Sequence, residues 1–337
     1  MNFHSNFLKL LIGKELTSQE SEKYFSHIFS GDFNVTESKA VLCLLAKRGE
    51  SATEVLGCLK AIRKLEPVTD CGTKPLIDTA GTGGDGKNTF NISTLASFVI
   101  AGAGIAVAKH GNRSVSSTCG SSDLLEALGA TLSDNLKKNI ACLKKVGYGY
   151  FHAPFFHPTF TRFQSLRREM KIKTIFNKLG PLLNPCKLTG QIVGVSNEKD
   201  LSIYAELLKS LTKNHRALVF HSSDGLDEIS VNAVTHGYLV QKGKTEPFRF
   251  DPKTLDLKSG SLKGGTAREN ASVAIELLRN KSIPNSIRDA VLINAAAGIW
   301  VANLAKDLSA GYRIAQQSLN SGAALLVFNR FLEASRK

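Results

Sequence analysis

The chain has 337 residues, and 43 Lys and Arg against 29 Asp and Glu give it a formal net charge of +14. Its hydrophobic content of 42% excludes a disordered or low-complexity protein, and its length favours two lobes over one core. The six cysteines form no CxxC pair and no cluster with histidine, which argues against a disulfide scaffold or zinc ribbon. The apolar runs near 94–108 and 290–305 are shorter than a membrane span requires. The positive charge leaves two partner classes open, nucleic acids and acidic small molecules.

The first seventy residues are predicted to form short helices that pack on one another. The segments 17–20 and 51–54 both fit the capping-box pattern, in which a hydroxyl and a carboxylate satisfy the free amides of a first helical turn. The N-terminus is no convincing export signal, because Lys9 interrupts its apolar stretch and no small-residue cleavage site follows. A cytoplasmic protein is therefore expected.

Strand and helix patterns alternate from about residue 75 onward. Strands are predicted at 75–78, 105–108, 148–153, 190–195 and 216–221, and helices from 91, through 123–128, and at 134–145, 199–212 and 271–280. This alternation predicts an α/β fold with a mostly parallel central sheet covered by helices. The basic segment 160–185 is again helical and is expected to return to the N-terminal helices.

A glycine-rich loop at 80–86 separates the first predicted strand from the helix that begins near Asn91. Its glycines let the backbone approach an anion closely, and the N-terminus of the following helix would point amide groups at a phosphate. Thr89, Ser93 and Thr94 add hydroxyl groups, and Ser93 is also a possible metal ligand. The loop is neither a Walker A motif nor GxGxxG. Its place between strand and helix favours phosphate binding over a structural turn.

A second polar loop, 109–117, follows the next predicted strand. Ligands of open α/β sheets bind at the carboxyl ends of the strands, so both loops are expected to line one crevice. Two cations, three serines and a glycine would suit a polyphosphate, although a solvated charged turn has the same composition.

Several motifs follow one another along the chain: GTGGD at 81–85, NIST at 91–94, KHGNR at 109–113, HP at 157–158, RRE at 167–169, TIFNKLGPLLNP at 174–185 and GLDEIS at 225–230. Together and in this order they resemble the motifs of the anthranilate phosphoribosyltransferase family. The resemblance covers residues 10–330. It implies transfer of the phosphoribosyl group of 5-phosphoribosyl 1-pyrophosphate (PRPP) to the amine of anthranilate, with release of pyrophosphate. This reaction is a step of tryptophan biosynthesis and needs Mg2+.

The resemblance also implies a homodimer whose subunits each have a small helical domain and a larger α/β domain. The helical domain is expected at 1–72 with the helices of about 160–185, and the α/β domain at 73–159 and 186–337. Neither a membrane nor a specific nucleic acid is expected as a partner.

Site residues follow from the matching motifs. The resemblance assigns PRPP binding to Gly81, Gly84, Asp85, Thr89, Asn91, Ile92, Ser93, Thr94, Lys109, His110, Gly111, Asn112, Arg113, Ser114, Val115, Ser116, Ser117 and Ser121. It assigns anthranilate binding to Gly81, His110, Asn112, His157, Phe160 and Arg167, with Arg167 binding the carboxylate. Ser93, Asp227 and Glu228 are assigned to Mg2+, with two ions per monomer.

No catalytic side chain is assigned, because the aromatic amine is already neutral at pH 7 and no general base is obligatory. Positioning of the amine and electrostatic stabilisation of the leaving pyrophosphate are expected to supply most of the rate.

Two other functions stay open at this point. A pyrimidine nucleoside phosphorylase shares the two-domain plan, but the GTGGD loop and the adjacent pair Asp227 and Glu228 favour a pyrophosphate substrate with Mg2+. A non-catalytic nucleic-acid-binding relative would lack the metal acids and carry a basic stripe, whereas the cations here are spread along the chain.

Overall fold

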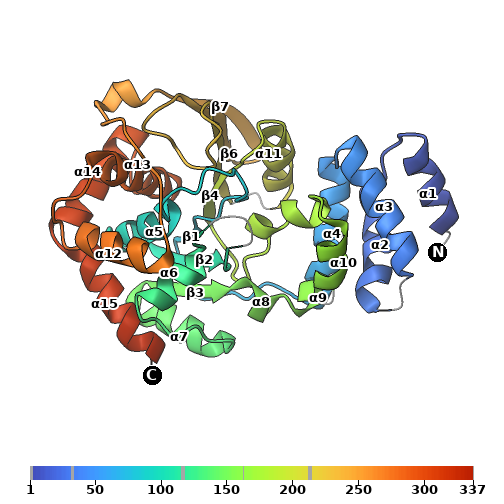
Figure 1. Ribbon diagram of the computed structural model, residues 1–337, viewed down its shortest axis with the longest axis horizontal. Helices are drawn as coiled ribbons and strands as arrows, with labels where there is room; N and C mark the ends of the chain where they lie inside the picture. The colour runs from blue at the N-terminus through green and yellow to red at the C-terminus, as the bar shows by residue number, and fades with distance from the viewer. Residues whose placement is uncertain (1–2, 32–33, 115–117, 162, 212–214, 337) are drawn as a thin grey trace.

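The computed structural model describes residues 3–31, 34–114, 118–161, 163–211 and 215–336. Four helices at one end of the molecule come from the N-terminal part of the chain (Figure 1). They are α1 (Phe3–Leu11), α2 (Ser18–Ser30), α3 (Val35–Arg48) and α4 (Ala52–Leu65). Both predicted capping boxes are confirmed: Thr17 with Glu20 begins α2, and Ser51 with Glu54 begins α4.

A later stretch of short helices packs against this N-terminal group. It consists of α8 (Ala153–Phe156), α9 (Pro158–Thr161), α10 (Gln164–Met170) and the 3-10 turns η1 (Ile175–Lys178) and η2 (Gly180–Leu182). The aromatic ring of Phe163 meets Phe29 edge to face, and the ring of Phe176 meets Phe25 in the same way. These apolar contacts join segments that are more than a hundred residues apart in the sequence.

The described residues form one sheet of seven strands in the order β3-β2-β1-β4-β5-β6-β7. The strands are β1 (Leu76–Asp78), β2 (Ala106–Gly111), β3 (Tyr148–His152), β4 (Gly190–Gly194), β5 (Arg216–Ser222), β6 (Thr235–Gln241) and β7 (Lys244–Phe250). Strands β1 to β5 run parallel, and β6 and β7 are antiparallel. The predicted fold class, a helical part beside a mostly parallel α/β part, is confirmed.

Helices cover both faces of the sheet. The remaining ones are α5 (Ile92–Gly102), α6 (Ser121–Ala127), α7 (Leu136–Val146), α11 (Asp200–Leu211), η3 (Pro252–Leu255), α12 (Ala267–Leu278), α13 (Asn285–Val301), α14 (Leu308–Asn320) and α15 (Ala323–Arg336). Leu218 and Phe220 of β5 join the core beneath α5 and α13, while Ala217 and Val219 join the core that includes α11 and α4. This alternation follows from the two-residue period of a strand.

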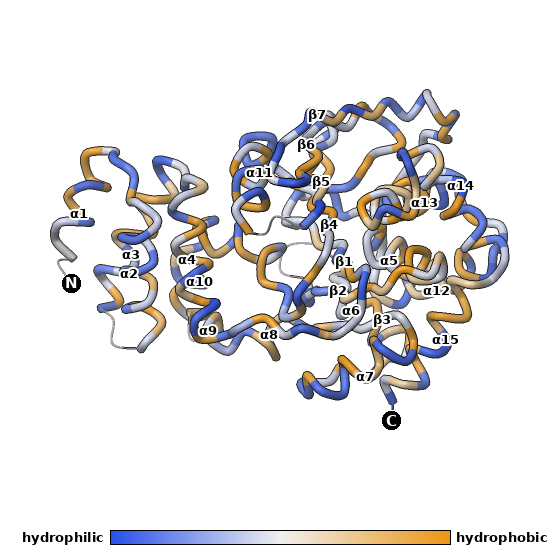
Figure 2. Tube along the Cα trace, turned by 180° about the vertical axis from the view of Figure 1, so that it is seen from behind, coloured by the Kyte–Doolittle hydropathy of each residue, from blue (hydrophilic) through white to orange (hydrophobic). Residues whose placement is uncertain are grey.

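The apolar runs noted in the sequence are buried segments of this fold. The first covers most of α5 and the start of β2, and the second covers most of α13. The traces of both helices are strongly hydrophobic (Figure 2), and their buried side chains belong to one core cluster. Within the part of the chain that the structure describes, no helix combines the length and apolarity needed to cross a bilayer.

The hairpin of β6 and β7 was not predicted from the sequence. Strand β7 lies at the edge of the sheet, and its exposed residues are mostly polar, with only Phe248 and Phe250 buried. The positive backbone φ of Lys242 and Gly243 makes the two-residue turn between the strands. Because a Lys-Gly pair is a weaker turn signal than Asn-Gly, the sequence gives little indication of this hairpin.

Candidate active site

Three loops meet at the carboxyl edge of the sheet. The glycine-rich loop (residues 80–86) follows β1, the KHGNR segment (109–113) ends β2, and the acidic loop (223–228) follows β5. Because β1, β2, β4 and β5 are parallel, their carboxyl ends lie at the same edge. The sequence prediction that these loops share one site is consistent with this topology.

Backbone hydrogen bonds hold the glycine-rich loop against the neighbouring strands. The amide of Thr82 donates to the carbonyl of Gly194 at 2.9 Å, and the amide of Gly83 donates to Oδ2 of Asp227 at 2.7 Å. A Cβ atom on Gly81 would lie 2.8 Å from the same Oδ2 and 3.3 Å from the Gly194 carbonyl oxygen. Glycine is therefore required at position 81 because the acidic loop passes so close to it.

A cluster of carboxylates forms where these two loops touch. Burial and the neighbouring Asp85 raise the pKa of Asp227 to about 7, and burial and the neighbouring Asp227 raise the pKa of Glu228 to about 8. Oδ2 of Asp85 is buried with no hydrogen-bond partner among the described residues. Carboxylates that repel one another, one of them with a buried oxygen that no described donor reaches, are the kind of site a hard divalent cation would stabilise.

These acids do not form a complete metal cage. Across the described residues, no group of three or more His, Cys, Asp or Glu side chains converges as a ready-made metal site. Such a donor set suits Mg2+, which keeps several water molecules and uses substrate phosphates as further ligands. The protein residues present thus fit a Mg2+ ion that binds together with a phosphorylated substrate.

Lys109 lies beneath the acidic cluster. Its side chain is 3% exposed, and its ammonium group donates to the carbonyl of Thr79 at 2.9 Å. Burial lowers the pKa of Lys109, and the charges of Asp78, Glu228 and Asp227 oppose that shift. The sequence assigns Lys109 to PRPP binding, and the structure adds that its ammonium group is buried near Asp78, Asp227 and Glu228.

Residues at the start of α5 are tied to their surroundings by hydrogen bonds. The Ser93 amide donates to Oε1 of Glu228 at 3.1 Å, so one helix N-terminal amide serves the acidic loop rather than pointing freely at a ligand. Asn91, next to the helix start, donates from Nδ2 to the Cys119 carbonyl at 3.0 Å and accepts from Nδ2 of Asn270 at 2.9 Å. Gly84 lies in the glycine-rich loop and Thr89 between that loop and α5, whereas Ile92 and Thr94 are buried within the fold.

The KHGNR segment is anchored to α6 and β3. Arg113 forms ion pairs with Glu126 and, at 3.6 Å, with Asp123. The Ser121 hydroxyl lies 2.9 Å from the Tyr150 hydroxyl and donates to the Asn112 carbonyl at 3.3 Å. Gly111 and Ser114 lie in the same stretch, with the Ser114 amide bound to Asp123. The predicted residues Val115, Ser116 and Ser117 lie outside the described residues.

Residues predicted to contact anthranilate come from both parts of the molecule. The ring of His110 lies 5.1 Å from that of His157, and the His157 ring lies 6.3 Å from that of half-buried Phe160, centroid to centroid. Arg167 belongs to α10, but its side chain lies outside the described part of the structure.

Two residues near the loops were missed by the sequence interpretation. Lys173 donates from its ammonium group to the Gly84 carbonyl at 3.1 Å, which brings a cation onto the glycine-rich loop. Asn184 donates to Oδ2 of the buried Asp78 at 2.9 Å and to the Ala108 carbonyl at 2.7 Å. A signal was available for both, since Lys173 precedes the TIFNKLGPLLNP motif and Asn184 lies at its end.

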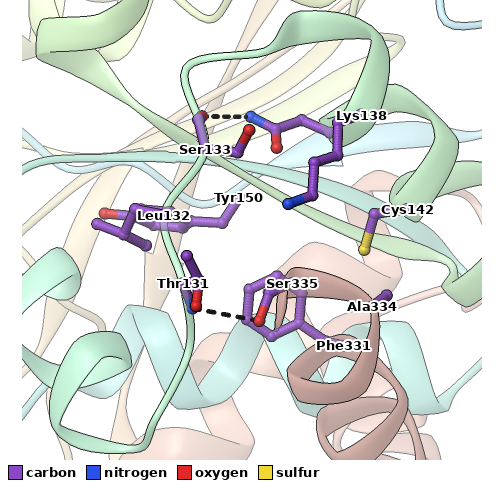
Figure 3. Close-up of a pocket in the computed structure, with 10 residues that line it drawn as sticks. Thr131, Leu132, Ser133, Lys138, Cys142, Tyr150, Phe331, Ala334 and Ser335 are labelled. Carbon is purple, nitrogen blue, oxygen red and sulfur yellow. Dashed lines mark hydrogen bonds between the residues drawn. The ribbon is translucent and has the colours of Figure 1, made fainter. Parts of the chain in front are cut away.

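A separate small cavity lies between the loop at 131–133, α7 and α15 (Figure 3). Its volume is about 20 Å³, which has room for a water molecule and not for a substrate. The Thr131 amide donates to the Ser335 hydroxyl at 3.3 Å beside it. This cavity is therefore not the active site.

Comparison with known proteins identifies the family. Residues 73–325 match the family described as "Glycosyl transferase family, a/b domain", and residues 7–65 match "Glycosyl transferase family, helical bundle domain". The anthranilate phosphoribosyltransferase of Thermomicrobium roseum is 41% identical over 324 residues, which cover 94% of this chain and 92% of the relative. The chain belongs to the anthranilate phosphoribosyltransferase family.

Solved structures agree with this assignment. Anthranilate phosphoribosyltransferase from Thermus thermophilus has a TM-score of 0.90 at 34% identity and covers 98% of this chain and 99% of its own. The Saccharomyces cerevisiae enzyme in complex with PRPP and Mg has a TM-score of 0.87 at 27% identity, covering 99% of this chain and 98% of its own. The resemblance seen in the motifs is confirmed, and the protein is an enzyme, a phosphoribosyltransferase of the glycosyltransferase type.

Proposed function

We propose that the three loops at the carboxyl edge of the sheet form the site at which this anthranilate phosphoribosyltransferase joins PRPP to anthranilate. A bond forms between the anthranilate nitrogen and the anomeric carbon of ribose, the bond from that carbon to pyrophosphate breaks, and the nitrogen loses a proton. The reaction belongs to tryptophan biosynthesis. The observation that carries the placement is the contact of the glycine-rich loop with the acidic loop, since it puts anion-binding backbone beside cation-binding carboxylates.

PRPP is placed along the glycine-rich loop and the KHGNR segment. Exposed Gly83 and Gly84 have φ of 65° and 73°, a conformation that leaves the loop backbone open to an anion. The ammonium group of Lys173, 3.1 Å from the Gly84 carbonyl oxygen, adds positive charge to that surface. Burying phosphate charge next to fixed donors stabilises the pyrophosphate as it leaves.

Asp227, Glu228 and Ser93 are proposed to hold Mg2+, with two ions per monomer. The yeast relative was solved with PRPP and Mg, and the buried Oδ2 of Asp85 without a donor fits a cation at this cluster. When bound, Mg2+ neutralises negative charge on the pyrophosphate. The positive charge of the buried Lys109 partly offsets the negative charge of Asp227 and Glu228.

Anthranilate is placed between the KHGNR segment and the short helices α8 to α10. Gly81, His110 and Asn112 would contact it from the sheet side, and His157, Phe160 and Arg167 from the other. A further structure of the yeast relative holds 4-fluoroanthranilate, which supports an acceptor site of this kind. The amine needs no obligatory general base, so orientation behind the anomeric carbon is the main task of these residues.

A homodimer and the domain boundaries belong to the same proposal. We place the boundary near residue 72 and assign about 160–185 to the helical domain, because Phe163 and Phe176 pack among the N-terminal helices. Exposed Leu8, Leu11 and Ile12 at and just after α1 offer an apolar surface for a second copy. Light scattering of the purified chain would give twice the monomer mass. The cytoplasmic location stays a prediction.

The decisive experiment follows anthranilate fluorescence after PRPP is added, with Mg2+ or with a chelator. Fluorescence is expected to fall when both PRPP and Mg2+ are present. Phosphate-dependent release of thymine or uracil from a nucleoside without metal, together with no loss of anthranilate, would instead identify a pyrimidine nucleoside phosphorylase. Steeply salt-dependent binding of single-stranded DNA without turnover would identify a nucleic-acid-binding relative.

A further inference from the structure

A buried chain of hydrogen bonds connects α4 with the end of β2. Oε2 of Glu66, at the C-terminal cap of α4, lies 2.7 Å from Nδ1 of His157. Nε2 of His157 lies 3.2 Å from Nε2 of His110, and Nδ1 of His110 lies 3.2 Å from the Gly180 carbonyl oxygen. The side chains of His110 and His157 are 5% and 3% exposed. All ring nitrogens of both histidines are therefore engaged away from solvent.

The hydrogen bond to the Gly180 carbonyl determines which nitrogen of His110 carries a proton. A carbonyl oxygen only accepts, so Nδ1 of His110 must carry a proton. Burial and the neighbouring His157 hold the pKa of His110 well below its usual range, and Arg63 and Lys109 add to this shift. His110 is therefore neutral, and the lone pair on its Nε2 accepts a hydrogen bond from Nε2 of His157.

At the other end of this series of hydrogen bonds, the Glu66 carboxylate determines whether Nδ1 of His157 donates or accepts. Burial alone would raise the pKa of Glu66, but hydrogen bonds from His157 and Thr159 outweigh it and the pKa is lowered. The Thr159 amide donates to Oε1 at 3.1 Å, so both carboxylate oxygens accept. Nδ1 of His157 is then a donor, as is its Nε2. Both nitrogens of the His157 ring therefore face acceptors, the Glu66 carboxylate on one side and Nε2 of His110 on the other.

We propose that Glu66 is a positioning residue for the acceptor site, because it holds His157 as an imidazolium that fixes His110 in one tautomer and one ring orientation. This inference rests on the proposed function, in which His110 and His157 face anthranilate. Both rings are then ordered before anthranilate binds, so no ordering cost falls on these side chains at the moment of binding. A residue at the end of α4 thereby determines the tautomer and ring orientation of His110 in β2.

The protonation state can be measured directly in the unliganded wild-type chain. Nitrogen-15 NMR of histidine-labelled protein at pH 7 is expected to show two protonated ring nitrogens for His157 and one, Nδ1, for His110. Each signal is assigned by its disappearance in His157→Gln or His110→Gln. A neutral His157 at pH 7, or His110 protonated at Nε2 alone, would overturn the proposal whatever the enzyme's activity.

Kinetics of Glu66→Gln test the positioning role. This isosteric variant is expected to raise the anthranilate KM about tenfold, the loss of one charge-assisted hydrogen bond, while the PRPP KM stays within about twofold. Glu66→Asp, which keeps the charge, is expected to recover part of the loss. Glu22→Gln removes the ion pair with Lys64 in the same group of helices and serves as the matched control.

Two outcomes would contradict the positioning role of Glu66. One is an unchanged anthranilate KM, and the other is an equal rise of both KM values, which would indicate a general structural role. If the wild-type chain did not consume anthranilate, the proposed function would fail, and the NMR spectrum alone would decide the protonation of His157. If Glu66→Gln did not fold, Glu66→Asp and the wild-type spectrum would decide it.

Discussion

The backbone amide of Gly83 donates to Oδ2 of Asp227 at 2.7 Å, although the two residues are 144 positions apart. The Asp227 carboxylate thus holds the loop proposed to bind phosphate, and it is also one of the acids proposed to bind Mg2+. Any change in Asp227 is expected to affect both substrate phosphate and metal.

Replacing Asp227 and Glu228 together by alanine should abolish turnover at ordinary Mg2+ concentrations. We expect kcat/KM for PRPP to fall by at least about 10²–10³-fold, because stabilisation of the leaving pyrophosphate is lost. Initial rates over a Mg2+ titration measure this, and the thermal midpoint shows that the variant is folded. Retained activity at wild-type Mg2+ levels would mean that the metal binds elsewhere.

Gly81→Ala should weaken PRPP binding by displacing the acidic loop. The new Cβ atom would lie 2.8 Å from Oδ2 of Asp227, so the loops must move apart at a cost of about 1–3 kcal/mol. A PRPP titration by calorimetry should show roughly tenfold or greater loss of affinity at constant Mg2+. Wild-type PRPP affinity in a folded Gly81→Ala chain would contradict the close approach of the two loops.

Arg167→Ala should raise the anthranilate KM by about 30-fold, because a charge-assisted contact with the substrate carboxylate contributes about 2 kcal/mol. The PRPP KM should stay nearly unchanged. Arg168→Ala, one position along α10, is the comparison variant and should have a much smaller effect on anthranilate. An unchanged anthranilate KM in Arg167→Ala would remove this arginine from the acceptor site.

The stability of the fold should decrease as pH falls from 6.5 towards 4, in part because of His215. Burial lowers the pKa of His215 from 6.5 to about 4, so in this window the unfolded chain binds a proton that the folded chain does not. The contribution is at most about 3 kcal/mol and is fully retained above pH 6.5.

Urea unfolding of wild type and His215→Gln at several pH values measures this contribution. The variant's free energy of unfolding should depend less on pH between 6.5 and 4. The exposed His27 on α2 provides the control, since His27→Gln should leave the pH dependence as in the wild type. Identical pH dependence in His215→Gln and wild type would show that the buried ring is not the cause.

Local sequence signals were sufficient to predict helix starts, the parallel part of the sheet and the family. The capping boxes at 17–20 and 51–54 were readable because their hydrogen bonds join residues three apart. The alternation of strands and helices predicted the parallel part of the sheet. The GTGGD, KHGNR and GLDEIS motifs were sufficient to indicate the family, because catalytic loops keep their residues together in sequence.

Contacts between distant residues were decided only by the tertiary structure. Lys109 is buried and donates to the Thr79 carbonyl, 30 positions away, and the sequence alone did not reveal this burial. Glu66 reaches His157 across 91 positions, and no local pattern marks that pair. Hydrogen bonds and burial depend on three-dimensional distance, so the same residue types could be identified in the sequence, but their partners and their protonation could not.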